Sequence, residues 1–495
     1  MGCIEALTLA LSAIITKEEM TRLEHDLLGT LEVPAEAYWG IHTLRAMQNF
    51  SISGVPIGEL PDLVRALALV KHAAAAANHA LGDLNPVQFQ HIAMACSEIA
   101  DGSLHDQFKV DVIQGGAGTS TNMNANEVVA NRALELMGHR KGEYQFLHPI
   151  EQVNRSQSTN DVYPTALRLA SIAGIRRLIS RIEELRIVFE HKAAQFSHVL
   201  KIGRTQLQDA VPMTLGQEFS AFAVMLGEDQ TRLAETLPLL CQINMGATAI
   251  GTGINTDPRY AGLVCEQLAL LTGESLTTAA DLVAATPDTG DFVQVSGVLK
   301  RVAVKLSKVC NDLRLLSSGP QSGFNEIRLP ERAAGSSIMV GKVNPIIPEV
   351  VNQIAYEVVG NDMTITMASE AGQLQLNPFE PIIGWSLFKS IRHLSAGCET
   401  LAEHCVKGIT ANEQVLAERV RSSAVFATAL NPYIGYENAT RIALQALQSG
   451  RGVGELVRQE GLLTDAQIEE VLRPENLTRP KSRAENASVD KVKVA

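Results

Sequence analysis

The chain has 495 residues, of which 46% are hydrophobic, 4% are aromatic and 19% are charged. This length is sufficient for a large buried core or for several domains. Lys and Arg number 42 against 54 Asp and Glu, which gives a formal net charge of −12. The negative charge argues against nucleic acid or an anionic membrane as a general partner, and an anionic substrate would need a locally positive pocket.

The composition is rich in small and aliphatic residues and favours packed helices over β-sandwiches. The seven cysteines are odd in number, widely spaced and without a C-x-x-C pair. We therefore expect reduced, mostly buried thiols and a reducing, cytoplasmic location. Neither the cysteines nor the twelve histidines cluster at the spacing of metal ligands, so no zinc site is predicted.

Residues 1–23 are predicted to form a poorly ordered N-terminal extension. The first fifteen are mostly apolar, but they lack the basic start of a signal peptide and are too short to span a bilayer. The short, turn-rich pieces that follow Glu24 suggest irregular structure with a small hairpin. A helix is predicted over residues 60–81, where Ala73 to Ala76 are small enough to permit close contacts between helices.

A glycine-rich loop over residues 111–126 is predicted to lead into a helix over residues 127–137. Its Gly116-Ala117-Gly118 portion lacks the third glycine and the βαβ context of a dinucleotide site. Thr119 and the hydroxyl and amide residues after it are suited either to capping a helix or to binding a carboxylate. The polar segment Ser158-Thr159-Asn160 also precedes a helix, and the same two interpretations apply.

Four long helices are predicted over residues 166–200, 215–244, 292–316 and 348–371. In the first, Ile175, Leu178, Ile182, Leu185 and Phe189 recur with gaps of three and four, as in a heptad stripe. At 1.5 Å per residue this helix would be roughly 50 Å long. Several such helices indicate a bundle, and the apolar stripes are assigned to its core.

The elements become shorter after Gly408. Asn431-Pro432, Gly435 and Gly450 interrupt helices, which predicts a compact helical C-terminal region up to residue 478. Residues 479–495 are charged and have little apolar content, so we expect a disordered tail.

Two further polar segments stand apart from these helices. Thr205-Gln206 is one, and the other is the loop Gly335-Ser336-Ser337-Ile338-Met339-Val340-Gly341-Lys342-Val343-Asn344, which Pro345 follows. The loop glycines permit backbone conformations closed to other residues, Lys342 supplies a point charge for an anion, and Asn344 both donates and accepts hydrogen bonds. The alternative interpretation is an ordinary Gly/Ser surface loop, which is what a Gly-Ser-Ser sequence alone would usually indicate.

The full string Gly-Ser-Ser-Ile-Met-x-x-Lys-x-Asn-Pro resembles the signature loop of the aspartase and fumarase superfamily. The resemblance extends from about Asp26 to about Leu477. Gly-Thr-Ser-x-Asn-Met-Asn-x-Asn-Glu-Val and Gly-Arg-Thr-Gln-Leu-Gln-Asp-Ala-Val-Pro-Met resemble the aspartate ammonia-lyases in particular. The resemblance implies an all-α, three-domain fold with a long central helical bundle, and we place the domains at residues 24–155, 156–407 and 408–478.

The resemblance also implies a lyase that reversibly deaminates L-aspartate to fumarate and ammonia. Ser336 would remove the C3 proton, Lys342 would support this step, and an aci-carboxylate would form. The implied substrate-binding residues are Thr119, Ser158, Thr159, Asn160, Thr205, Gln206, Ser337, Lys342 and Asn344. In the family, three subunits of a homotetramer share each site. No organic cofactor is implied. A divalent cation such as Mg²⁺ activates some members, but the sequence shows no dedicated metal site.

Two residues depart from the family pattern. Gln206 stands where fumarases have a histidine thought to pair with a glutamate, for which the candidate here is Glu349. Because glutamine does not titrate, the change favours aspartate over malate. Val340 stands where the family usually has proline, so loop closure should cost more conformational entropy, and we expect weaker substrate binding or slower closure but not inactivity. The alternatives are fumarate hydratase and a non-catalytic structural protein on the same scaffold.

Overall fold

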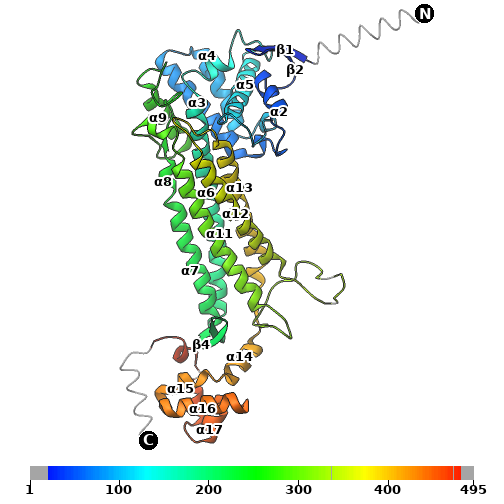
Figure 1. Cartoon of the computed structure of the whole chain (residues 1–495), viewed down its shortest axis with the longest axis vertical. Coiled ribbons are helices and arrows are strands. Elements are labelled where there is room, and N and C mark those ends of the chain that lie inside the picture. Colours follow the sequence, from blue (N-terminus) through cyan, green and yellow to red (C-terminus); the bar gives the residue numbers. More distant parts are fainter. Residues whose placement is uncertain (1–20, 336, 340, 472, 481–495) are drawn as a thin grey trace, which may run out of the picture. The chain divides into compact units, whose positions relative to one another are not determined.

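The structure is a computed structural model that describes residues 21–335, 337–339, 341–471 and 473–480. The described elements are mainly helices (Figure 1). Contacts divide the chain into two compact units. The first comprises the chain up to Ile179 with Thr231–Arg301 and Glu357–His393, and the second comprises Ser180–Gln230, Val302–Tyr356 and the chain from Leu394 onward. Most of the expected N-terminal extension and of the expected tail lies outside the described residues.

The first unit begins with the expected small hairpin, in which strands β1 (Thr21–Asp26) and β2 (Gly29–Pro34) pair antiparallel. The hairpin starts inside the segment predicted to be an extension. The elements that follow are α2 (Ile41–Asn49), η1 (Ile57–Glu59), α3 (Pro61–Leu81), α4 (Pro86–Ala100), η2 (His105–Gln107), α5 (Thr119–Leu136) and the π-helix η3 (Pro149–Val153). Helix α3 packs against α4, and three of its predicted contact alanines, Ala73, Ala74 and Ala75, are buried.

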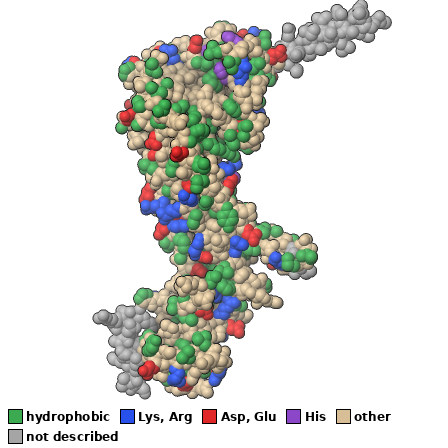
Figure 2. Space-filling model, viewed as in Figure 1, with side chains coloured by type: hydrophobic (Ala, Val, Ile, Leu, Met, Phe, Trp, Pro, Cys, Tyr) green, Lys and Arg blue, Asp and Glu red, His purple; other side chains and the backbone are tan. Residues whose placement is uncertain are grey.

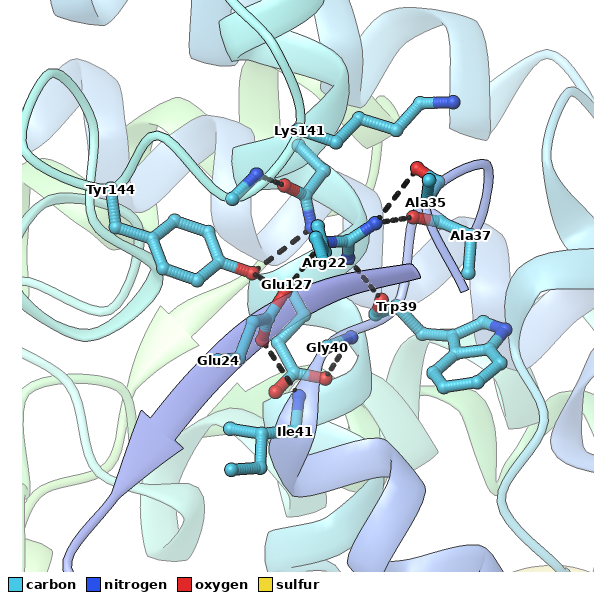
Figure 3. Close-up of polar contacts among 12 residues, drawn as sticks. Arg22, Glu24, Ala35, Ala37, Trp39, Gly40, Ile41, Glu127, Lys141 and Tyr144 are labelled. Carbon is cyan, nitrogen blue, oxygen red and sulfur yellow. Dashed lines mark hydrogen bonds and ion pairs between the residues drawn. The ribbon is translucent and has the colours of Figure 1, made fainter. Parts of the chain in front are cut away.

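A glutamate pair fixes the start of this unit onto α5 (Figure 3). Glu127 of α5 accepts hydrogen bonds from the backbone N–H groups of Gly40 and His42, each at 2.8 Å. Glu24 of β1 accepts from the N–H of Ile41 at 2.8 Å. A Cβ added at Gly40 would lie 2.5 Å from the Glu24 carboxylate, so the close approach requires glycine. The pair thereby holds β1 and the start of α2 against α5.

The long helices are α6 (Thr159–Gln195), α7 (Leu215–Ala234), α11 (Gly290–Leu316), α12 (Ile346–Glu370) and α13 (Glu380–His404). The five stripe residues predicted for the core of α6 are all fully buried. Helix α6 has 37 residues, which corresponds to roughly 55 Å. All four predicted helices were wrong in extent: α6 runs from Thr159 to Gln195, α7 ends at Ala234, α11 begins at Gly290, and α12 runs from Ile346 to Glu370. Helix α13 was not predicted.

Polar contacts join these helices within each unit. In the first unit, Asp362 of α12 accepts from Ser296 at 2.8 Å and from Lys300 at 2.6 Å, both on α11. In the second unit, the amide of Asn352 on α12 donates to Ser307 Oγ of α11 at 2.9 Å. The predicted helical bundle is confirmed in this form. The short elements between the long helices are α8 (Leu237–Leu240), β5 (Gln242–Ile243), α9 (Tyr260–Thr272), β6 (Thr277–Thr278) and α10 (Leu282–Ala285).

The rest of the second unit contains two small sheets and the C-terminal helices. Strands β3 (Leu200–Thr205) and β4 (Gln208–Thr214) form a hairpin, and β7 (Ile327–Arg328) pairs with β8 (Thr410–Ala411). The remaining elements are η4 (Val406–Gly408), α14 (Glu413–Ser422), α15 (Phe426–Ile434), α16 (Tyr436–Ser449), α17 (Val453–Gln459), α18 (Asp465–Val471) and α19 (Pro474–Leu477). Helices α15 to α18 contribute buried apolar residues to one core.

Acidic and basic side chains lie beside one another on the face shown in Figure 2. On α6, Arg186 pairs with Glu183 at 2.6 Å. Within the described ranges, no helix is long and apolar enough to cross a bilayer. The six cysteines in these ranges are free thiols and mostly buried, as predicted.

Candidate active site

The first polar segment lies in a helix and not in a loop, which corrects the sequence prediction. Gly116, Ala117 and Gly118 have φ angles of 91°, 55° and 87°, and α5 begins directly afterwards at Thr119. A Cβ at Gly118 would lie 2.5 Å from the Tyr163 ring, so this approach to the helix requires glycine. The turn places the polar residues of the segment in the first two turns of α5. Thr119 itself is exposed, and its hydroxyl donates to the Gly116 carbonyl at 2.7 Å.

The second polar segment meets the first inside the same unit. Asn122 of α5 donates its side-chain N–H to Thr159 Oγ1 at 3.2 Å. Asn160 donates to the carbonyl of Ala249 at 2.7 Å, and its own carbonyl accepts from Asn244 at 3.0 Å. Thr159 is buried, whereas Ser158 and Asn160 are half-buried. The structure thus brings together two of the four segments that the sequence singled out.

Asp161 holds the second segment in place, and sequence reasoning missed it. Its carboxylate is fully buried and accepts from the backbone N–H groups of Ser158 at 3.0 Å, Thr248 at 2.9 Å and Gly246 at 3.2 Å. Burial raises the pKa of Asp161 to about 7, and these N–H groups oppose that shift. An acidic residue three positions after a serine at the start of a helix was the available signal.

The third segment forms the tip of the β3–β4 hairpin. Gln206 and Leu207 connect the strands with φ angles of 54° and 61°, as in a two-residue type I′ turn, where asparagine or glycine is usual. Non-glycine residues in this region are strained, and such strain is concentrated at functional sites. Thr205 and Gln206 are exposed at this tip. Gln206 makes no hydrogen bond with its candidate partner Glu349 in the described part of the chain.

Charged residues buried beneath this hairpin hold it in place. Glu326 is 1% exposed and pairs with Lys201 at 2.8 Å and with Arg204 at 2.7 Å, both on β3. Burial opposes ionisation of Glu326, but these two cations hold its pKa below the ordinary value. Glu326 therefore fixes the strand that ends at Thr205.

The fourth segment is a loop that closes on itself. Asn344 donates its side-chain N–H to the Gly335 carbonyl at 3.2 Å. A Cβ at Gly335 would lie 1.1 Å from the Lys342 carbonyl oxygen, so no other residue fits there. Ser337 and Lys342 are exposed. The predicted base Ser336 and the atypical Val340 lie outside the described residues.

The predicted site residues divide between the two units. Thr119, Ser158, Thr159 and Asn160 belong to the first unit, whereas Thr205, Gln206, Ser337, Lys342 and Asn344 belong to the second. Among the residues that the structure describes, no three His, Cys, Asp or Glu side chains are grouped to hold a metal ion.

Comparison with known proteins identifies relatives along nearly the whole chain. The sequence matches a family described as Lyase over residues 29–360 and one described as Fumarase C C-terminus over residues 426–479. It is 60% identical over 470 residues to an aspartate ammonia-lyase of Pseudomonas fluorescens, which covers 95% of this chain and 98% of the relative. An aspartate ammonia-lyase of Escherichia coli K12 is 53% identical over 464 residues, or 94% of this chain and 97% of the relative.

Solved structures with the same fold are similar over comparable lengths. A fumarate lyase:delta crystallin from Brucella melitensis, bound to cobalt, is 53% identical with a TM-score of 0.91 and covers 93% of this chain and 100% of its own. A class II fumarase from Schistosoma mansoni is 34% identical with a TM-score of 0.86 over the same shares of the two chains. The mainly helical fold of the aspartase and fumarase type is thereby confirmed. This chain belongs to the lyase family of that superfamily, in the group of the aspartate ammonia-lyases.

Proposed function

We propose that this chain catalyses the reversible elimination of ammonia from L-aspartate, which yields fumarate. The observation that carries the proposal is the identity of 60% and 53% to two aspartate ammonia-lyases over nearly their full lengths. The hydroxyl and amide groups of Thr159 and Asn160, held beside α5, supply neutral hydrogen-bond donors of the kind that a dicarboxylate needs.

In the proposed mechanism, Ser336 in its deprotonated form removes a proton from C3 of aspartate. The electron pair of the C–H bond moves onto the adjacent carboxylate, which becomes an aci-carboxylate. The electron pair then returns from the aci-carboxylate and forms the C2–C3 double bond, while the C2–N bond breaks and ammonia leaves. Preorganised donors around the carboxylate oxygens lower this barrier. A serine hydroxyl is a poor base in water, so Lys342 and inward N–H groups of the loop are proposed to stabilise its deprotonated form.

No step of the proposed mechanism uses a metal ion or an organic cofactor, since the leaving amine needs neither. Activation by a divalent cation such as Mg²⁺ is compatible with this mechanism. Gln206 does not titrate, so we assign it an orienting role and not a proton relay.

We further propose a cytoplasmic homotetramer in which three subunits share each site. Three apolar side chains on the part of α12 in the first unit support subunit association. Val359, Met363 and Met367 recur every four residues and are 42%, 61% and 66% exposed. A contiguous apolar face of this kind usually marks a protein interface.

The test is fumarate formation from L-aspartate, measured beside L-malate, because a class II fumarase also matches this chain well. We expect aspartate to be the preferred substrate and Ser336→Ala to lower kcat roughly a hundredfold or more. Ser97→Ala is the matched control, since Ser97 lies on α4 and its hydroxyl donates to the Ala93 carbonyl of the same helix. Preference for malate would favour fumarate hydratase. Unchanged activity of Ser336→Ala would refute the assigned base.

A further inference from the structure

A lysine without any exposed surface lies behind the Ser158-Thr159-Asn160 segment. Lys71 is on α3, and its side chain is 0% exposed. Its Nζ lies 2.7 Å from Asn122 Oδ1, 2.9 Å from Asn154 Oδ1 and 2.9 Å from Gln157 Oε1. These partners belong to α5 and to the connection between η3 and α6. All of these residues belong to the first unit.

The surrounding contacts fix the orientation of each of the three amides. Asn154 donates to the Gln157 carbonyl at 3.2 Å, so its oxygen must face Lys71. Gln157 donates to the carbonyls of Val153 and Arg155, each at 3.0 Å. Asn122 donates to Asn154 Oδ1 at 3.1 Å. Reversing any one amide would bring two oxygens or two N–H groups together, so the network has one consistent arrangement.

This arrangement requires Lys71 to be an ammonium group. Three acceptor oxygens match its three N–H donors, whereas the lone pair of a neutral amine would face one of them. Burial lowers the pKa of Lys71 to about 7, and the Asp161 carboxylate opposes that shift. Besides Asp161, the titratable group that acts on Lys71 is the buried thiol of Cys96. The three acceptor oxygens contact the charged form directly.

The network sets the direction of the hydrogen bond to Thr159. Because Lys71 occupies the oxygen of Asn122, the amide nitrogen of Asn122 must face Thr159, to whose Oγ1 it donates at 3.2 Å. The hydroxyl oxygen of Thr159 is therefore an acceptor on this side. Its proton points elsewhere, and no residue in the described ranges accepts it.

We propose that Lys71 is a positioning residue that makes Thr159 present its hydroxyl proton to a carboxylate of the substrate. The chain of donors runs from Lys71 through Asn122 to Thr159 and ends at the substrate. The inference rests on the proposed function, because Thr159 is taken to bind the dicarboxylate. A lysine that only stabilised the packing of α3 against α5 would affect folding but not the hydrogen bond that Thr159 offers.

A double-mutant cycle between Lys71 and Thr159 tests the proposal, with KM for aspartate and the affinity for succinate as readouts. Lys71→Met and the isosteric Thr159→Val should each raise KM for aspartate and lower the affinity for succinate by about tenfold or more. The changes in kcat should be smaller. Because Lys71 acts through the Thr159 hydroxyl, the double variant should be no weaker than the weaker single variant. The inference would be overturned if the losses of affinity in the two single variants multiplied in the double variant. An unchanged KM in Lys71→Met would also overturn it.

Asn122→Asp provides a second variant in case Lys71→Met does not fold. It keeps an oxygen facing the ammonium group and replaces the donor facing Thr159 by an acceptor, so the Thr159 hydroxyl turns inward. The same weakening is expected, again absent in the Thr159→Val background. Unchanged succinate affinity in folded Asn122→Asp would contradict the proposal.

Lys192→Met is the matched control for removal of a buried lysine. Lys192 is 9% exposed, donates to the Ile409 carbonyl at 2.8 Å and belongs to the second unit. Its loss should lower the melting temperature without changing KM. Parent protein that binds succinate but forms no fumarate would refute the proposed function while the affinity cycle still tests Lys71. Parent protein that binds no dicarboxylate would refute both.

Discussion

The first unit stabilises its buried carboxyl groups in different ways. Asp161 accepts three backbone N–H groups, and Glu127 accepts three together with the Thr43 hydroxyl. Glu380, the first residue of α13, is 2% exposed, and no hydrogen bond to its carboxyl group is found among the described residues. Burial raises the pKa of Glu380 from 4.5 to about 8, against the opposing effect of Arg168. Glu380 is therefore favoured in its neutral form.

This raised pKa predicts a pH-dependent contribution to stability. Between pH 4.5 and about 8 the folded protein keeps a proton that the unfolded chain releases. The contribution is thus fully present below pH 4.5 and is lost as the pH rises through about 8. Glu380→Gln should remove it, so the melting temperature of the variant relative to the parent should increase from pH 5 towards about 9.

Glu437→Gln serves as the control for Glu380→Gln, because Glu437 is exposed on α16. Its melting temperature should stay parallel to that of the parent across the same pH range. A difference between Glu380→Gln and the parent that does not change with pH would show that Glu380 is ionised in the folded protein.

At the scale of elements, the β3–β4 hairpin depends on charges buried at its base. Glu326 joins Lys201 and Arg204 of β3, and Arg419 of α14 approaches the same carboxylate at 3.3 Å. Three positively charged side chains therefore contact the carboxylate of Glu326, which is almost fully buried. Removing the negative charge leaves buried positive charges that are only partly compensated, because Glu218 still pairs with Lys201 at 2.6 Å.

Glu326→Gln should therefore destabilise the hairpin strongly. We expect a loss of roughly 3 kcal/mol in the free energy of unfolding, measured by chemical denaturation. Amide hydrogen exchange over residues 200–214 should accelerate, and KM should rise because Thr205 lies at the end of β3. Glu403→Gln breaks an exposed ion pair with Lys407 and should change the free energy of unfolding far less, because solvent screens this pair. Equal effects of the two substitutions would refute a special role for the buried group.

At the scale of the whole molecule, the predicted site residues belong to two separate units of the chain. Thr159 is in the first unit, and the described residues of the signature loop are in the second. If each site combines residues from different subunits, as we propose, two inactive variants can complement each other in a mixed oligomer.

Co-expression of Ser336→Ala with Thr159→Val tests this proposal. Random mixing leaves both native residues together in about a quarter of the sites, so roughly a quarter of the parental activity should return. Each variant expressed alone supplies the baseline. A mixture no more active than its components would show that both residues act within one chain.

The sequence by itself determined the family and the buried stripe of the longest helix. The stripe from Ile175 to Phe189 predicted the buried face of α6, because residues three and four positions apart lie on the same face of a helix. The loop string from Gly335 to Asn344 predicted the superfamily, because its residues are contiguous. Helix boundaries were predicted less accurately than buried faces. The polar residues after Gly118 suggested a loop, but they form the start of α5.

Only the tertiary structure decided which polar residues meet. Lys71 stands between valine and histidine in an alanine-rich helix, and its partners lie 51, 83 and 86 residues further along the chain. The strained tip at Gln206 likewise lacks the glycine or asparagine that would have predicted a turn. Hydrogen-bond direction and burial depend on these distant contacts, which local spacing does not encode. The sequence therefore predicted which segments carry polar side chains, but it did not predict the residues that hold these segments in place.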